Sequence, residues 1–214
     1  MIKKHKWTLL AGSIVILLPI LAGLLLWNRL PEQIPTHWGP TGEVDGWSTK
    51  SQAVFLMPCV LLALHWICVL ASTMDPKNKN QNKKAMTLVL WICPVITVLL
   101  STLTLGSALG WQPNVSMIMP VLMGILFMVI GNYLPKCTPN YTIGIKIPWT
   151  LNSEANWNAT HRFAGKLWFV GGALLLPCSF LPTFWPAIAL LVITLVMVIV
   201  PIVYSWRFYK RESA

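Results

Sequence analysis

The sequence predicts an all-α, polytopic membrane protein with six transmembrane helices and both termini in the cytosol. Three observations support this fold class. Hydrophobic residues fill 56% of the 214 positions and charged residues only 10%, well under the roughly 25% of a soluble domain. The apolar residues come in runs long enough to cross a bilayer, and the basic residues fall mostly on one side of those runs. We interpret the whole chain, 1–214, as one integral membrane domain.

About 20 apolar residues cross the hydrocarbon layer of a typical membrane. Six runs come near this length, and the fourth and fifth are on the short side. They are roughly Trp7–Trp27, Ala53–Ser72, Ala85–Leu109, Met117–Leu134, Ala164–Leu181 and Trp185–Trp206. Lysines precede the first run, as in a signal peptide. That run is too long for a typical h-region and no small-x-small site precedes Asn28, so we expect a retained anchor.

The basic residues set the expected orientation. With a cytosolic N-terminus, the outer segments hold only Arg29 and Lys50 of the 16 basic residues, which satisfies the positive-inside rule. The others lie inside: Lys3, Lys4, Lys6, Lys77, Lys79, Lys83, Lys84, Lys136, Lys146, Arg162, Lys166, Arg207, Lys210 and Arg211. The net charge of +10 is therefore mostly a topology signal. We expect contact with anionic lipid headgroups and no direct nucleic-acid partner.

Several absent motifs argue against enzymes and pumps. The chain has no Walker A, H-E-x-x-H, G-x-S-x-G or dinucleotide fingerprint, and no pair of carboxylates within the spans. We expect no catalytic residues and no cofactor. The five cysteines suggest neither a disulfide framework nor a metal or redox role. His65 lies within the second span, where we expect a neutral ring hydrogen-bonded to a neighbouring helix.

Only two polar segments have room for a site: 28–52 outside and 135–163 inside. Prolines and glycines make the outer segment turn-rich, so we expect it to be compact. His37, Glu43 and Asp45 would suit a divalent cation, but their spacing matches no strong metal motif and we expect no metal there. The segment Asp75–Lys84 is interpreted as a solvated inner connector.

The inner segment contains a dense polar block, Asn140–His161, in which polar residues and Trp gather without helical or strand periodicity. Such a block is costly in hydrocarbon, so it must lie in water, among headgroups or against protein. Two interpretations remain open. The block is either a recognition surface, or an amphipathic connector that Trp149 and Trp157 anchor at the membrane.

Both polar segments resemble one family. The outer segment contains Leu30-Pro-x-x-Ile-Pro-x-His37, Gly42-Glu-Val-Asp-Gly46 and Lys50, and it resembles the N-terminal domain of the SdpI family of bacterial membrane proteins. The inner segment contains Gly144-Ile-Lys-Ile-Pro-Trp-Thr150, then Trp157 and Thr160-His-Arg-Phe-Ala-Gly165, and it looks like that family's C-terminal signature. The resemblance covers nearly the whole chain. Lys146-Ile147 departs from the more usual Arg-Thr, which keeps the charge and loses a bidentate contact.

The resemblance implies immunity to a secreted antimicrobial peptide, exercised from the bacterial cytoplasmic membrane. It also implies a receptor-like role, in which a soluble repressor is held at the membrane when toxin is present. The expected partners are a peptide toxin outside, a cytosolic repressor inside, and membrane lipids. Alternatives are a small transporter or channel, or a membrane enzyme with a metal on the outer segment.

Each partner has its own candidate residues. The outer, toxin-facing candidates are Pro35, His37, Gly42, Glu43, Asp45 and Lys50. The inner, partner-binding candidates are Asn140, Gly144, Lys146, Pro148, Trp149, Thr150, Trp157, Thr160 and His161.

Overall fold

The computed structural model describes residues 2–77, 81 and 83–212. The chain forms two compact units: Met1–Met74 with Met86–Asn114, and Asp75–Ala85 with Val115–Ala214. We call them unit 1 and unit 2. Each has its own packed helices and its own polar assembly. The interpretation of the chain as a single domain stays a prediction.

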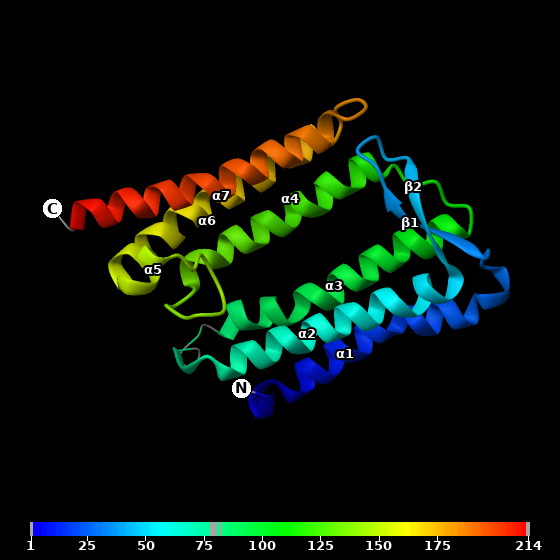
Figure 1. Cartoon of the computed structure of the whole chain (residues 1–214), viewed down its shortest axis with the longest axis horizontal. Helices are drawn as coiled ribbons and strands as arrows, with labels where there is room; N and C mark the ends of the chain where they lie inside the picture. Colours follow the sequence, from blue (N-terminus) through cyan, green and yellow to red (C-terminus); the bar gives the residue numbers. More distant parts are fainter. Residues whose placement is uncertain (1, 78–80, 82, 213–214) are drawn as a thin grey trace. The chain divides into compact units, whose positions relative to one another are not determined.

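Unit 1 consists of helices and one β-hairpin. In Figure 1 its long helices run side by side, and the hairpin lies at their end away from the N-terminus. Its helices are α1 (Ile2–Leu25), α2 (Met57–Met74) and most of α3 (Lys83–Ala108). The hairpin strands are β1 (Gln33–Trp38) and β2 (Val44–Thr49). A 3-10 turn (Trp27–Arg29) precedes the hairpin and a π-helical turn (Gln52–Leu56) follows it.

Unit 2 is a bundle in which α6 packs between α4 and α7. Its helices are α4 (Val115–Tyr133), α5 (Pro148–Asn152), α6 (Glu154–Cys178) and α7 (Trp185–Glu212). Glycines bring α4 and α6 close together: a Cβ built on Gly124 would lie 2.7 Å from the Gly172 carbonyl oxygen. Small residues allow such close backbone approach between membrane helices. Figure 1 places α5 at the end of this unit that also holds the C-terminus.

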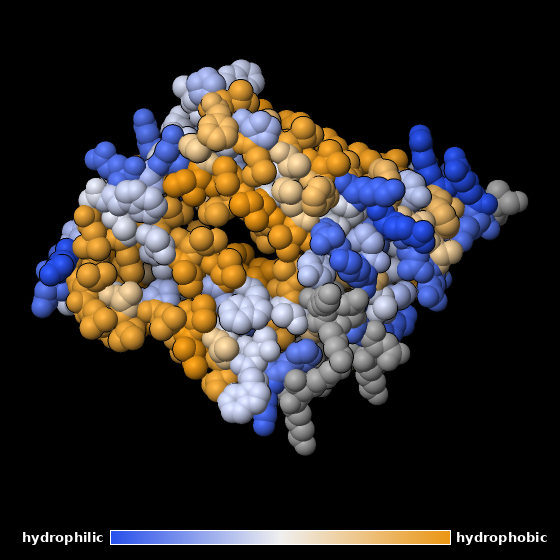
Figure 2. All heavy atoms as spheres, turned by 180° about the vertical axis from the view of Figure 1, so that it is seen from behind, coloured by the Kyte–Doolittle hydropathy of each residue, from blue (hydrophilic) through white to orange (hydrophobic). Residues whose placement is uncertain are grey.

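Five helices in the described part of the chain are long and apolar enough to cross a membrane, which supports a multi-pass membrane protein. They match five of the six expected spans: His5–Leu25, Gln52–Met74, Met86–Ala108, Val115–Lys136 and Trp185–Glu212. Figure 2 shows broad apolar surface on one face of the molecule. Most of the remaining run, Ala164–Leu181, forms the later part of α6, which ends at Cys178. Because α6 begins at Glu154 and carries Arg162 and Lys166, its first turns are polar. The sixth span and the cytosolic termini stay predictions.

Two expectations need correction. The outer segment is not a set of turns, because residues 33–49 form an antiparallel hairpin in an otherwise helical chain. Along β2, exposed and partly buried side chains alternate, as in a strand with one face against protein. His65 also departs from expectation. It is buried, but within the described residues its Nε2 has no hydrogen-bond partner.

Candidate functional site

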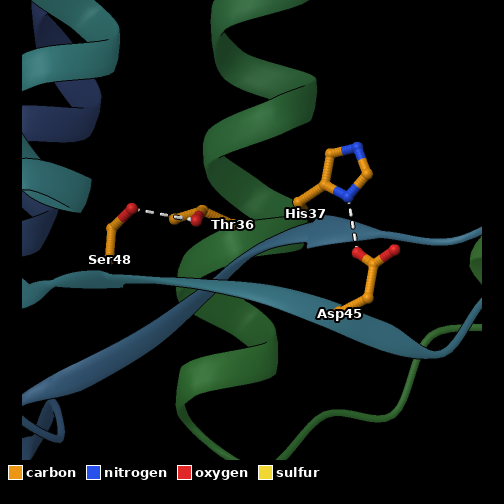
Figure 3. A network of polar contacts seen from close by, with 4 residues as sticks. All are labelled: Thr36, His37, Asp45 and Ser48. Atoms are coloured by element: carbon orange, nitrogen blue, oxygen red, sulfur yellow. Dashed lines mark hydrogen bonds and ion pairs between the residues drawn. The ribbon is translucent and has the colours of Figure 1, made fainter.

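The outer assembly is built on the paired strands β1 and β2. Thr36 Oγ1 lies 3.0 Å from Ser48 Oγ, which joins the two strands through their side chains. His37 Nδ1 lies 2.5 Å from Asp45 Oδ1, and both side chains are largely exposed. Figure 3 shows the His37 and Asp45 side chains pointing toward each other from neighbouring strands. The hairpin thus presents an imidazole–carboxylate pair at its surface.

Lys50 anchors the hairpin to the rest of unit 1. Its side chain is only 11% exposed, and its Nζ lies 2.9 Å from Glu32 Oε1. The same ammonium lies 5.2 Å from the centre of the Trp27 ring, within the range of a cation–π contact. Ile34 is also buried, in a cluster with Leu30 and other apolar residues. The base of the hairpin is therefore fixed by charge and by apolar packing.

The six outer candidates do not all reach the surface. His37, Glu43 and Asp45 are exposed, whereas Pro35 and Lys50 are buried. Gly42 adopts a φ of 86° in the loop between the strands, a conformation that favours glycine. The described residues contain no group of three His, Cys, Asp or Glu side chains able to hold a metal. The toxin-facing roles of the outer candidates stay predictions.

The inner assembly centres on a stacked pair of rings in α6. Trp157 is 0% exposed and His161 is 1% exposed. The two ring centres are 4.0 Å apart and the planes differ by 19°. Trp157 Nε1 donates to the Cys137 carbonyl oxygen at 2.8 Å. The Trp157 side chain thus connects α6 to the segment that follows α4.

Hydrogen bonds define the protonation of His161. Its Nε2 accepts from the Ile145 backbone N–H at 2.9 Å, so Nδ1 carries the proton and donates to the Trp157 carbonyl oxygen at 2.8 Å. Burial lowers the pKa of His161 to about 4, against a smaller opposing effect of its hydrogen bond to Trp157. The imidazole is therefore neutral at physiological pH and serves as a structural acceptor.

This pKa predicts that the stability of the protein falls at mildly acidic pH. Above pH 6.5 the ring is neutral in both folded and unfolded chains. Between pH 6.5 and about 4 only the unfolded chain gains the proton, so stability is lost progressively, by on the order of 3 kcal/mol in all. Burial raises the pKa of nearby Cys137 to about 11, so its thiol stays neutral over this range. Thermal unfolding of purified protein between pH 8 and 4.5 measures the loss. His161→Gln, which does not titrate, should reduce this slope, and an equal slope in both proteins would contradict the assignment.

A second network joins α6 to α7. Asn156 Nδ2 donates to the Ser205 carbonyl oxygen at 2.9 Å. Its Oδ1 accepts from Ser205 Oγ at 2.7 Å and from Thr160 Oγ1 at 2.9 Å. All three residues are buried. Fully satisfied buried polar groups of this kind fix one packing of two helices.

The loop before α5 is organised by Asn140. Its Oδ1 accepts from the backbone N–H groups of Thr142 and Ile143, at 2.8 and 2.6 Å. Its Nδ2 donates to the carbonyl oxygens of Thr138 and Ile143, at 2.8 and 2.9 Å. Thr150 Oγ1 then accepts from the Ile147 N–H at the start of α5. The polar side chains here satisfy backbone groups that no regular structure pairs.

Asp75 contributes to the same loop, although the sequence did not single it out. Its Oδ2 accepts from the Tyr141 N–H at 2.7 Å and from Thr142 Oγ1 at 3.1 Å. Its Oδ1 accepts from the Lys77 N–H at 2.9 Å. Gln81 Oε1 accepts from the Thr138 N–H at 3.1 Å. The chain has only 6 acidic residues, and this scarcity is the feature of the sequence that could have pointed to Asp75.

These contacts correct the interpretation of Asp75–Lys84 as a solvated connector. Asp75 is 7% exposed, and both it and Gln81 hold the loop that begins the inner signature. Positions 78–80 and 82 lie outside the described residues. The described part of the connector therefore belongs to the inner assembly.

The nine inner candidates divide by burial. Asn140, Thr150, Trp157, Thr160 and His161 are interior residues, each 1% exposed or less. Lys146 and Pro148 are exposed, and Gly144 and Trp149 are partly exposed. A buried side chain does not touch a partner directly in this conformation. We therefore interpret the five interior residues as a scaffold that holds a surface made by the others, and the recognition roles stay predictions.

Comparisons with known proteins cover both assemblies. Residues 136–205, which include the inner signature, match the SdpI/YfhL protein family. Residues 14–62, which include the hairpin, match a domain of unknown function, DUF1648. The chain is 27% identical over 206 residues to Immunity protein SdpI of Bacillus subtilis (strain 168), covering 92% of this chain and 94% of that protein. No solved structure matches. These findings confirm the resemblance to the SdpI family.

Proposed function

We propose that this protein of the SdpI family is an immunity protein that protects a bacterium against a secreted antimicrobial peptide. It would act from the cytoplasmic membrane without catalysing a reaction. The observation that carries the proposal is the presence of two ordered polar assemblies in an otherwise apolar chain, one in each unit. The similarity to Immunity protein SdpI along 92% of the chain supports the same role.

Protection against killing is the direct test. A sensitive bacterium expressing the chain should survive the secreted peptides of the source strain at concentrations that kill cells with an empty vector. A variant with the hairpin residues 33–49 replaced by a flexible linker should lose that protection while reaching the membrane in similar amount. Equal killing with and without the intact chain, at matched expression, would contradict the proposal.

The proposed topology has six spans, with the hairpin outside and both termini inside. The 25 residues of α6 extend about 37 Å, of which the apolar part from Ala164 to Cys178 accounts for about 22 Å. To cross the roughly 30 Å of hydrocarbon, α6 would bring part of its polar first turns into the membrane, with Arg162 and Lys166 reaching the inner interface through their long side chains. The predominance of basic residues in the inner segments supports the same orientation.

Single cysteines in a cysteine-free background should distinguish this topology from a five-span arrangement. Thr41→Cys, in the hairpin loop, and Phe184→Cys, between α6 and α7, should react with an impermeant reagent on intact cells. Asn158→Cys, on the exposed side of α6, should react only after the cells are opened. Protection of position 184 on intact cells would remove the sixth span, and reversed labelling of 41 and 158 would reverse the orientation.

We further propose that the inner assembly holds a cytosolic repressor at the membrane. The accessible residues around the scaffold are Tyr141, Lys146, Pro148 and Trp149. Lys77 Nζ lies 4.6 Å from the centre of the Tyr141 ring, and Lys146 Nζ donates to the Thr142 carbonyl oxygen at 3.0 Å. The surface is therefore basic and aromatic, which fits an acidic or amphipathic protein partner.

Trp149→Ala should reduce recruitment of that partner. A Trp at the centre of a docking surface contributes more than about 2 kcal/mol, or roughly thirtyfold in affinity. The measurement is membrane fractionation of a soluble repressor encoded beside the gene, normalised to the amount of membrane protein. Phe169→Ala, an exposed apolar residue later in α6, serves as the matched control. Unchanged recruitment by Trp149→Ala at normal protein level would contradict the role of this surface.

A further inference from the structure

The hairpin is a sheet of only two strands, so each strand has one edge that no strand covers. Lys50 N–H donates to the Glu32 carbonyl oxygen at 3.0 Å, and the register pairs Ile34 with Ser48 and Pro35 with Trp47. In an antiparallel ladder, hydrogen-bonded and non-hydrogen-bonded pairs alternate. Ile34 and Ser48 therefore bond to each other, whereas Pro35 and Trp47 direct their backbone groups away from the partner strand.

The two edges are not equivalent. Pro35 has no N–H, so the β1 edge lacks a donor where an added strand would need one. Trp47, on β2, has both an outward N–H and an outward carbonyl. Thr49 N–H, on the same edge, donates to Gln52 Oε1 at 3.2 Å, which agrees with this outward direction. Among the described residues nothing from outside the hairpin bonds to the Trp47 backbone. The edge of β2 is thus the open one.

Exposed side chains along β2 define what could lie against this edge. Trp47 is 58% exposed, and Asp45, two residues earlier on β2, where the register shifts, is exposed as well. Glu43 adds a second exposed carboxylate beyond the strand. Lys50, the nearest cation in the sequence, is buried and paired with Glu32. The open edge therefore combines an indole with negative charge.

We propose that the β2 edge binds an extended segment of a cationic peptide, which adds to the hairpin as a third strand. Main-chain hydrogen bonds at Trp47 would supply affinity, and alternate side chains would supply specificity. An apolar side chain of the peptide would lie beside Trp47, because cross-strand neighbours share a face, and a Lys or Arg further along the peptide would lie near Asp45 and Glu43. The proposal rests on the proposed immunity function, in which this peptide is the toxin.

Two substitutions at position 47 distinguish the contribution of the backbone N–H to binding from that of the side chain. Trp47→Ala removes the indole and keeps the outward N–H. Trp47→Pro removes the indole and the outward N–H, while the bonds between Ile34 and Ser48 stay intact. Gly46 precedes this position, so the added proline ring meets no side chain on the residue before it. Similar thermal unfolding of the two variants would establish that the hairpin persists in both.

Binding is measured with a fluorescent Thr-Val-Thr-Lys-Thr-Val-Thr-Lys-Thr peptide and protein in phosphatidylcholine nanodiscs, whose zwitterionic lipid does not attract the cationic probe. The control peptide has Glu in place of Lys. We expect the Lys peptide to bind the wild-type protein more tightly than the Glu peptide. Trp47→Pro should bind the Lys peptide roughly three- to tenfold more weakly than Trp47→Ala, the loss of about one hydrogen bond.

A second variant keeps the proposal testable if Trp47→Pro disturbs the hairpin. Asp45→Asn preserves a hydrogen-bond partner for His37 and removes the charge, so it should reduce the preference for the Lys peptide over the Glu peptide. Equal binding of the two peptides to wild-type protein, no binding of either, or equal binding by the two Trp47 variants would overturn strand addition. Survival of toxin-treated cells is scored separately, so failure of immunity and failure of edge binding are distinguished.

Discussion

Replacing Trp157 by alanine should cost about 3–5 kcal/mol of stability, the range for truncating a large buried aromatic residue. The indole is 0% exposed and stacks on His161. It also packs against Cys137 in the cluster at the base of the inner assembly. Its loss would leave a cavity between α6 and the loop after α4. Thermal unfolding of purified protein and the amount of protein in the membrane both measure the effect.

Trp157→Phe is the matched control for the hydrogen bond. It keeps most of the ring and leaves the Cys137 carbonyl oxygen without its donor at 2.8 Å, so we expect a smaller loss of roughly 1–3 kcal/mol. Trp149→Ala, at a partly exposed position, should change stability less than either variant. Wild-type stability of Trp157→Ala would show that this indole is not a scaffold residue and would reopen its direct role in binding.

The helices of this chain could be predicted well because long apolar runs leave few alternatives in a membrane. The exception was α6. Its polar first half, from Glu154, has the composition of a loop, yet it is helical because Asn156, Thr160 and His161 face bonding partners rather than lipid. Helical periodicity was hidden there because the buried face is polar as well as the exposed one.

The hairpin was missed for a different reason. Prolines and glycines around residues 31–46 indicate turns, and the two strands are only six residues each. Pairing of such short strands depends on tertiary support, here the Lys50 anchor and the burial of Ile34. None of this is visible in a local pattern.

The sequence located the inner site, but it did not show which of the site's residues are buried. Trp157 and His161 suit a docking surface or a core equally well as residue types. In the structure their rings hydrogen-bond to backbone groups, the Ile145 N–H and the Cys137 carbonyl, and backbone groups carry no residue-specific signal. Asp75 was missed likewise, because its partners lie in a loop far along the chain.

Replacing Gly144 by alanine should be the most damaging single-methyl change in the inner assembly. Gly144 has a φ of 115°, which L side chains rarely adopt. A Cβ there would lie 2.5 Å from His161 Nε2 and 3.2 Å from the Trp157 ring. The imidazole has little freedom to retreat, because the Ile145 N–H and the Trp157 carbonyl hold both its nitrogens. We expect a loss of about 3 kcal/mol or more, from backbone strain and overpacking together.

Gly110→Ala separates these two contributions. Gly110 has a φ of 95° and no atom within 4 Å of a built Cβ, so its substitution should cost only the backbone strain, on the order of 1 kcal/mol. Chemical or thermal unfolding of both variants measures the difference. The excess loss in Gly144→Ala is the repulsion against the ring pair, and it should shrink when His161→Ala removes the imidazole in a double variant. Equal losses at positions 110 and 144 would mean that the loop moves away from the stack, and the inner assembly would then be less rigid than its hydrogen bonds imply.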